Sequence, residues 1–305
     1  MAEMIPMISI RRISHATFET PDIEAQIDHY TKVTGLVVAA RENDRALLSC
    51  KVGQLVLQLV KGERARCAKL AFQVAPGSDF GEIAKWLTAQ GIKSDIRSDD
   101  IPGMSKSLVF DDIKGTTIEL ITDWKFLTPN QSVSGVAPFK LGHVAFVVPD
   151  VQAVADFYSR ILGFRVSDWI EDIFVFMRCN PDHHTVNFVK GKRANMHHVA
   201  FQLRDFSHLE NGCDVLSQNR IPIIWGPLRH GPGHNVSIYH RNPDQQVVEF
   251  FAELDQMLDE DLGFFDPRPW HEDQPQRPKV WTRENRGIAG WGPPPSHDWH
   301  MNPED

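Results

Sequence analysis

The second half of the chain contains short apolar runs separated by turn residues, a pattern typical of half-buried strands. The runs are LGHVAFVV, DIFVFMRC, HTVNFVKG, HHVAFQL, VSIYHRN and QVVEFFAE. Two stretches, near 150–162 and 206–219, instead repeat apolar residues at the spacing of an amphipathic helix. Asp150 stands where a helix N-cap belongs, and Gly163 stands where a helix ends. The predicted order is therefore strand, helix, several strands, and then the same again.

The first half of the chain repeats this pattern. Residues 13–18 (ISHATF) resemble residues 141–146 (LGHVAF), and in both copies Pro-Asp follows before a helix-like segment. Three residues of the first copy match three of the second at offsets of 128, 129 and 130 residues: His15 with His143, Lys69 with His198, and Glu119 with Glu249. Offsets this regular indicate two homologous halves. We place them at 6–128 and 138–255, joined by the polar linker LTPNQSVSGVAPFK.

Within each half, the order of strands and helices favours a βαβββ unit used twice. The predicted fold is therefore α+β, with four such modules, and each pair of modules makes a curved sheet around a cavity. Residues 258–305 differ, because they are rich in proline and contain four tryptophans: Trp270, Trp281, Trp291 and Trp299. So aromatic a segment is unusual for a disordered tail. We expect it to lie extended over the body and to bury its tryptophans, either as an anchoring strap or as a lid over the second cavity.

Composition argues against several classes of protein. The 305 residues, 42% hydrophobic and 24% charged, indicate a soluble globular chain of about two domains. The net charge of −8 argues against a nucleic-acid partner. No apolar run approaches the roughly 20 residues of a membrane helix, and the N-terminus shows no secretory signal. The four cysteines lack CxxC spacing, so we expect no disulfide framework and a cytoplasmic location.

Three residues of the second half could hold a metal ion. His143, His198 and Glu249 each lie inside a short apolar run. A buried carboxylate without a partner is costly, so Glu249 is expected to pair or to bind a metal. Two histidines and one carboxylate are the set that holds Fe(II) on one face and leaves the other face open. The first half has Lys69 in place of His198, and a protonated lysine has no lone pair for a metal. We therefore predict one site, with Lys69 paired to Glu119.

Further polar side chains lie close to these residues in the sequence. They belong to the segment NPDHHTV, which contains His184, and to the glycine-rich loop LRHGPGHN, which leads into a strand with Tyr239. Imidazole and phenol groups can transfer protons or steady bound oxygen. A loop histidine is often simply exposed, however, and Tyr239 could equally be a core residue. On pattern alone, His184 is the strongest candidate, ahead of His230, His234 and Tyr239.

Together these motifs resemble the type I extradiol ring-cleaving dioxygenases of the vicinal oxygen chelate superfamily. The segments that carry the resemblance are LGHVAFxVxD, NPxHHTVNF, MHHVAFQL, LRHGPGHN and YHRNPDxQxVEFF. The similarity spans about 250 residues and is strongest in 138–255. It implies two barrel-like domains, of which the second binds Fe(II), or less often Mn(II), through His143, His198 and Glu249. It also implies a catecholic substrate, O2 and a homo-oligomer such as a dimer or tetramer.

The resemblance further implies roles for single residues. His184 would be the acid–base residue beside the O2 site, while His230 and Tyr239 would hydrogen-bond the catechol oxygens. His183 and His197 would be supporting residues. The reaction would insert both atoms of O2 and open the ring next to the two hydroxyl groups. Its product would be of the 2-hydroxymuconic semialdehyde type.

The chain departs from some members of this family at positions that would face the substrate. An arginine that would hold a substrate carboxylate in homoprotocatechuate-type relatives is Trp225 here, and Ala145 replaces a common asparagine. We therefore expect an aryl or alkyl substituent on the ring, although the tail motif GWGPPPSHDW is similar to the homoprotocatechuate type. The predicted substrate-binding residues are Phe176, Trp225, His234 and His197, with Phe174 as a further wall.

Two other functions fit the same superfamily. A metal-dependent lyase of the glyoxalase or epimerase type would usually use a fourth protein ligand. A metal-free protein of the resistance type would sequester an aromatic ligand and would not need the three metal ligands. The intact ligand set, together with His184, His230 and Tyr239, favours oxygen chemistry.

Overall fold

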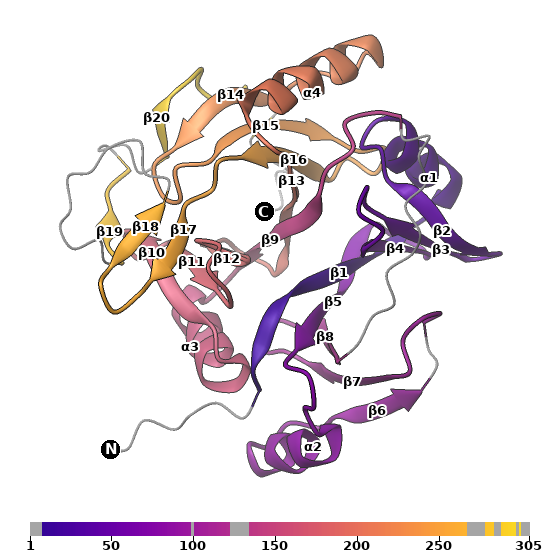
Figure 1. The fold of residues 1–305 in the computed structure, drawn as a ribbon, viewed down its shortest axis with the longest axis vertical. Helices are drawn as coiled ribbons and strands as arrows, with labels where there is room; N and C mark the ends of the chain where they lie inside the picture. Colours follow the sequence, from indigo (N-terminus) through magenta and orange to yellow (C-terminus); the bar gives the residue numbers. More distant parts are fainter. Residues whose placement is uncertain are drawn as a thin grey trace.

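The computed structural model describes residues 8–98, 101–122, 134–266, 278–283, 288–296 and residue 299. Two mixed sheets dominate it, one of eight strands in the first half and one of ten strands in the second. The first sheet lies at the lower right of Figure 1 and the second at the upper left. No helix in the described part of the chain is both long and apolar enough to cross a membrane.

The first half consists of two βαβββ modules. The first comprises β1 (Ile10–Thr20), α1 (Ile23–Lys32), β2 (Val37–Glu42), β3 (Arg45–Ser49) and β4 (Leu55–Lys61). The second comprises β5 (Arg66–Val74), α2 (Phe80–Ala89), β6 (Asp95–Ser98), β7 (Lys106–Asp111) and β8 (Thr117–Ile121). The strand order is β2-β3-β4-β1-β5-β8-β7-β6, so the two modules meet where β1 runs antiparallel to β5.

The second half repeats this arrangement. Its modules are β9 (Lys140–Val148), α3 (Val151–Leu162), β10 (Arg165–Ile170), β11 (Phe174–Arg178) and β12 (Val186–Lys190), followed by β13 (Asn195–Gln202), α4 (Phe206–Gln218), β14 (Trp225–His230), β15 (Val236–Arg241) and β16 (Val247–Ala252). Strand β9 runs antiparallel to β13, as β1 does to β5. The predicted α+β fold of four βαβββ modules is confirmed. The boundaries 6–128 and 138–255 remain a proposal, which the division into two sheets supports.

Local signals in the sequence place the helices. Asp150 is the N-cap of α3, and its side chain accepts a hydrogen bond of 2.9 Å from the backbone N–H of Ala153. The helix ends at Gly163, whose left-handed backbone (φ 71°) suits glycine. Strands β10 and β14 lie outside the predicted runs, because RVSDWI and WGPLRH interrupt the apolar pattern with charged residues or with Gly-Pro.

A buried polar cluster joins the two halves. Lys114, in the turn between β7 and β8, pairs with Asp112 and lies 3.2 Å from the hydroxyl oxygen of Tyr158 on α3. The Tyr158 hydroxyl donates to Asp112 at 2.9 Å, and the Lys114 ammonium lies 4.2 Å from the centre of the Phe146 ring. Burial lowers the pKa of Lys114, while the charge of Asp112 opposes that shift. Tyr158 and Phe146 of the second half thus pack against the ion pair of Lys114 and Asp112 in the first half.

The described parts of the C-terminal segment extend the second sheet at both edges. Strands β17 (Gln256–Asp259) and β18 (Phe264–Asp266) form a hairpin, whereas β19 (Val280–Trp281) pairs with β10 and β20 (Ala289–Trp291) pairs with β14. Trp281 is buried, but Trp291 is 45% exposed, so the expectation that all the tryptophans are buried is wrong for Trp291. Trp270 lies outside the described residues. We retain the covering role of 258–305 as a proposal, which the added edge strands support.

Candidate metal centre and active site

A cavity of about 220 Å³ lies on the inner face of the second sheet. Eight adjacent strands, from β10 to β14 in sheet order, each contribute at least one lining residue, with Ile170 at one end and Trp225 at the other. Laid flat, eight strands about 4.8 Å apart would span about 34 Å. The sheet must therefore curve around the cavity, with α3 and α4 packed against its outer face.

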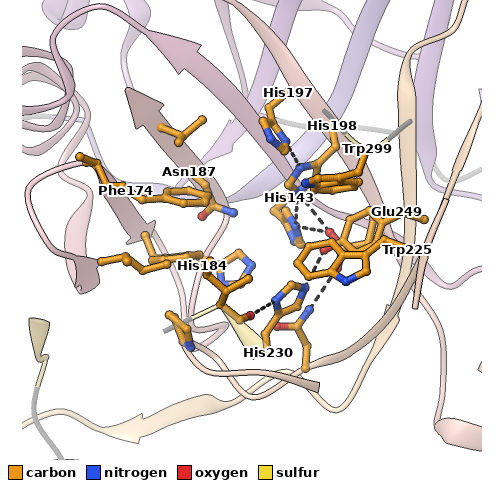
Figure 2. Close-up of a pocket in the computed structure, with 18 of the residues that line it drawn as sticks. His143, Phe174, His184, Asn187, His197, His198, Trp225, His230, Glu249 and Trp299 are labelled. Atoms are coloured by element: carbon orange, nitrogen blue, oxygen red, sulfur yellow. Dashed lines mark hydrogen bonds and ion pairs between the residues drawn. The ribbon is translucent and has the colours of Figure 1, made fainter. Parts of the chain in front are cut away.

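His143 on β9, His198 on β13 and Glu249 on β16 converge in this cavity (Figure 2). Strand register brings them together, because Ala200 of β13 pairs with His143 on one side and with Glu249 on the other. The Nε2 atoms of the two histidines lie 3.2 Å apart, and each lies 3.1 Å from Oε2 of Glu249. All three side chains are buried.

These donor atoms fit a metal ion. The donor atoms are two imidazole nitrogens and a carboxylate oxygen, all within 4.8 Å of one another, and their lone pairs point toward one position. These lone pairs repel one another unless a cation lies between them. Ligands at right angles, about 2.1 Å from a metal ion, lie about 3 Å apart. Burial lowers the pKa of His143, although Glu249 opposes this shift. Burial would raise the pKa of Glu249, but His143 and His198 hold it well below its usual range. A neutral imidazole and an ionised carboxylate are the forms that coordinate metals.

The corresponding position of the first half contains an ammonium group. His15 and Glu119 pair with Ala71 on either side, as His143 and Glu249 pair with Ala200. Nζ of Lys69 lies 3.3 Å from Oε1 of Glu119, which confirms the predicted pair, and Nε2 of His15 lies 3.4 Å from the other oxygen. Burial would raise the pKa of Glu119, but His15 and Lys69 lower it to about 2. This carboxylate is therefore neutralised without a metal ion.

Replacing Lys69 with alanine should leave the metal content at one ion per chain. The ammonium group neutralises Glu119 in the first half and has no contact with the ligands of the second. Metal analysis of the purified variant tests this, with His198→Ala as the matched change that should lose the metal. A folded Lys69→Ala protein without metal would contradict the assignment of one site to the second half.

Two buried residues hold the other oxygen of Glu249. The Ser237 hydroxyl donates to Oε1 at 2.6 Å, and the Asn235 amide donates to the same oxygen at 3.1 Å. Oε2 is thereby left facing the two histidines. Partners of this kind fix the orientation of a ligand and raise metal affinity.

Replacing Ser237 with alanine should lower the metal affinity about 10–100-fold, the usual effect of losing such a partner. Competition with a chelator of known affinity measures this change. Ser107→Ala is the control, because Ser107 is buried in the first half and its hydroxyl has no hydrogen-bond partner among the described residues. Equal affinities in the two variants would show that the Ser237 contact does not support the site.

His197 lies directly beside the ligand His198. Their Nδ1 atoms are 2.7 Å apart. Because Nε2 of His198 must keep its lone pair to bind a metal, Nδ1 of His198 carries the proton and donates to His197. Burial lowers the pKa of His197 to about 3, so this ring is a neutral acceptor. His197 also lines the cavity, where it packs edge-on against Trp299.

A chain of hydrogen bonds orients His184 beside the three ligands. Nε2 of His183 lies 3.2 Å from the Asp168 carboxylate, and Nδ1 of His183 lies 3.0 Å from Nδ1 of His184. Because a carboxylate only accepts, His183 donates to it from Nε2 and accepts at Nδ1. His184 then donates from Nδ1 and keeps the lone pair on Nε2. Burial, with His143 and His183, holds the pKa of His184 well below its usual range, so it is a neutral base.

Tyr239 and His230 form a hydrogen-bonded pair on the cavity wall. The Tyr239 hydroxyl lies 2.7 Å from Nε2 of His230, and Nδ1 of His230 lies 2.9 Å from the carbonyl oxygen of Ile288. A neutral His230 donates to that carbonyl and accepts from Tyr239. Burial lowers the pKa of His230, whereas burial and the charge of Glu249 raise the pKa of Tyr239 well above its usual range. Both groups are thus held neutral.

Aromatic side chains form two opposing walls. Phe176 stacks on Phe174 with ring centres 4.5 Å apart. Trp225 stacks on Tyr239 at 5.3 Å and packs against Trp299 at 4.6 Å. Phe174 lies on one side of the cavity and the two tryptophans lie on the other (Figure 2). The space between them suits a planar aromatic ring.

His234 does not belong to this cavity. It is absent from the lining residues and fully buried, with Nδ1 2.6 Å from the Asp255 carboxylate and the ring packed against Trp281. The loop turns sharply at Gly233 and His234, which both have positive φ, and this turn directs the imidazole toward Asp255. The prediction that His234 binds substrate is therefore corrected: it ties its loop to the chain after β16.

Several residues of the site carried no signal in the sequence. They are Asp168, Asn187, Asn235, Ser237 and Trp299. Asp168, Asn235 and Ser237 act through partners that lie 12–15 positions away along the chain. Asn187 and Trp299 reach the cavity through strand register and through the path of the C-terminal segment. Only Trp299 lay in a segment already expected to cover the cavity.

Comparisons with known proteins agree with this geometry. A family model described as the Glyoxalase/Bleomycin resistance protein/Dioxygenase superfamily matches residues 140–250, which include all three candidate ligands. Metapyrocatechase 2 of Cupriavidus necator is 27% identical over 271 residues, which cover 82% of this chain and 83% of that protein.

Solved structures share the whole fold. The Mn(II)-bound glyoxalase from Novosphingobium aromaticivorans aligns with a TM-score of 0.84 and 24% identity, covering 97% of this chain and 95% of that one. Homoprotocatechuate 2,3-dioxygenase from Brevibacterium fuscum, in complex with 3,4-dihydroxyphenylacetate, aligns with a TM-score of 0.82 and 22% identity, covering 98% and 94%. Residues 140–250 therefore match the Glyoxalase/Bleomycin resistance protein/Dioxygenase superfamily, and the chain over most of its length is similar in sequence to extradiol dioxygenases.

Proposed function

We propose that this protein is a metal-dependent extradiol dioxygenase that cleaves the ring of a catecholic compound with O2. The observation that carries the proposal is the cluster of three donor atoms 3.1–3.2 Å apart at a cavity that also contains neutral His184. The names of the relatives, metapyrocatechase among them, support the same reaction class.

We propose Fe(II) as the resident metal, with Mn(II) as the alternative. Two histidines and one carboxylate that leave further positions open are typical of Fe(II) sites that use O2. The Mn(II)-bound structure of the Novosphingobium protein supports the alternative. The bound metal would act as a Lewis acid that lowers the pKa of a substrate hydroxyl and would offer an open position to O2.

The residues of the chain would bind the substrate and move its protons. Nε2 of His184 takes a proton from a substrate hydroxyl and returns it when the ring opens. The Tyr239 hydroxyl donates its proton to His230, so its oxygen accepts a hydrogen bond from a substrate hydroxyl on the other wall. Phe176 and Trp225 enclose the aromatic ring and keep water from the reacting carbon atoms.

A metal-dependent lyase is the second candidate, because the Novosphingobium neighbour is named a glyoxalase. An enzyme of that type would usually use four protein ligands. In the described part of the chain, the group of side chains able to hold a metal has three members. The three-residue set, with open positions for substrate and O2, favours the dioxygenase.

We also propose that the protein forms a homo-oligomer, such as a dimer or tetramer. The hairpin of β17 and β18 supports this, since it exposes Leu258 (56%), Leu262 (71%) and Phe264 (47%) close together in the chain. Exposed apolar clusters of this kind are typical of protein contacts. Light scattering after size-exclusion chromatography measures the subunit number, and a monomer would contradict the proposal.

The reaction itself is tested with protein purified without air. Catechol, 3-methylcatechol, 2,3-dihydroxybiphenyl and homoprotocatechuate are added separately with O2, while oxygen uptake and visible absorbance are followed. The proposal predicts a yellow ring-opened product and one mole of O2 consumed per mole of catechol. Binding of an aromatic compound without oxygen uptake, in protein that contains iron, would contradict it.

A further inference from the structure

One row of side chains crosses the second sheet beside the metal ligands. Asn187 of β12 pairs with Phe176 of β11 on one side and with Ala145 of β9 on the other, and Ala145 pairs in turn with His198 of β13. Side chains of paired residues point to the same face of a sheet. Phe176, Asn187 and His198 accordingly all line the cavity. Asn187 is thus two strands from the ligand His198, and its pairing partner on the strand between them is Ala145.

The Asn187 amide is buried without satisfying its oxygen. The residue is 1% exposed, and Oδ1 has no hydrogen-bond partner among the described residues. A buried acceptor left unpaired is destabilising, because it has lost its hydrogen bonds to water and gained none from the protein. Figure 2 shows the amide facing into the cavity, on the side of Phe174 and opposite Trp225 and Trp299. The oxygen itself is buried, and it would receive a hydrogen bond from a ligand when the amide turns about its Cβ–Cγ bond toward the cavity.

The first half of the chain contains the same position with its acceptor satisfied. Gln58 of β4 pairs with Thr17 of β1, as Asn187 pairs with Ala145. There the Thr17 hydroxyl donates to the Gln58 amide oxygen at 3.2 Å. The amide therefore occurs in both halves, but the internal donor occurs only in the half without a metal site. In the second half, alanine in place of threonine leaves the acceptor available.

We infer that Asn187 is a substrate-binding residue, whose amide oxygen accepts a hydrogen bond from a hydroxyl group of the bound aromatic compound. The inference rests on the proposed function, because it assumes a hydroxylated aromatic ligand. It adds a contact on the wall opposite the Tyr239–His230 pair. Those two groups already satisfy each other at 2.7 Å, whereas the Asn187 oxygen has no such partner among the described residues.

The chemistry of the ligand explains why an acceptor is useful there. A catechol that loses one proton on binding keeps one O–H group, which needs an acceptor in the cavity. Amide oxygen can accept that bond without taking the proton. Asn187 would thus fix the orientation of the ring and help to determine which oxygen keeps its proton.

Anaerobic titration with 4-nitrocatechol tests the inference without turnover, because the visible absorbance of this compound changes when it is deprotonated on binding. Asn187→Ala should raise its dissociation constant about tenfold, the effect of losing one buried hydrogen bond, with metal content unchanged. Ala145→Thr should have a similar effect, since the new hydroxyl would occupy the amide oxygen as Thr17 does in the first half. Gln58→Ala is the matched control and should bind 4-nitrocatechol as the wild type does.

The double variant separates this mechanism from simple crowding by threonine. If Ala145→Thr acts through Asn187, adding it to Asn187→Ala should cause little further loss, because interacting residues are not additive. Wild-type affinity in folded, metal-containing Asn187→Ala would overturn the inference while leaving the proposed function intact. No absorbance change with the wild-type protein would instead contradict the proposed function, and the inference with it.

Discussion

Replacing Glu249 with glutamine should remove the metal and abolish turnover. Ser237 and Asn235 donate two hydrogen bonds to Oε1, so an amide oxygen is expected to take that position. The amide nitrogen would then face His143 and His198, and it has no lone pair to offer a metal. We expect the affinity to fall by more than the 10–100-fold that loss of an outer hydrogen bond causes.

Metal analysis and oxygen uptake measure both consequences of Glu249→Gln. Glu119→Gln is the matched control, because Glu119 occupies the corresponding strand position of the first half beside Lys69. It should keep one metal ion per chain. A Glu249→Gln protein with full metal occupancy and wild-type turnover would remove Glu249 from the ligand set.

Replacing His184 with phenylalanine should leave the metal bound but slow the reaction about 10²–10⁴-fold, the usual contribution of an acid–base residue. The imidazole is oriented by His183 and Asp168 so that its lone pair lies on Nε2, which is therefore the atom that can exchange a proton with the substrate. Its ring centre lies 4.3 Å from that of His143, beside the metal position and not within the ligand cluster.

Single-turnover experiments with the anaerobic substrate complex separate binding from chemistry in His184→Phe. The variant should still bind the substrate without O2, while the step that follows addition of O2 becomes slow. His208→Gln is a suitable control, since His208 bonds to the backbone of Val136 outside the cavity. Wild-type rates in His184→Phe would remove its acid–base role.

Much of the fold could be predicted because its signals are local or repeated. Asp150 caps a helix through a contact three residues away, and such contacts are visible in any sequence. Comparison of the two halves also helped, because Lys69 at the position that corresponds to His198 already indicated a single metal site. The three ligands could be identified because each lies inside an apolar strand, where burying a polar side chain is costly unless it has a partner.

The remaining features of the site depend on which residues of neighbouring strands pair, and no short segment of sequence reveals that pairing. The amide of Asn187 matters only because Ala145, 42 positions earlier, is its strand partner and lacks a hydroxyl group. His234 was wrongly assigned because a glycine-rich motif does not show which way its side chains point. Its partner, Asp255, follows 21 residues later. Trp299 reaches the cavity only through the path of the C-terminal segment.

The most direct test of the account is the fate of oxygen atoms. Anaerobic protein with one Fe(II) per chain is mixed with a catechol that turns over and with ¹⁸O2, and the product is analysed by mass spectrometry. A ring-cleaving dioxygenase places both labelled atoms in a ring-opened product, which is the predicted result. An unlabelled isomer of the substrate, or a quinone without added oxygen, would contradict the proposed reaction.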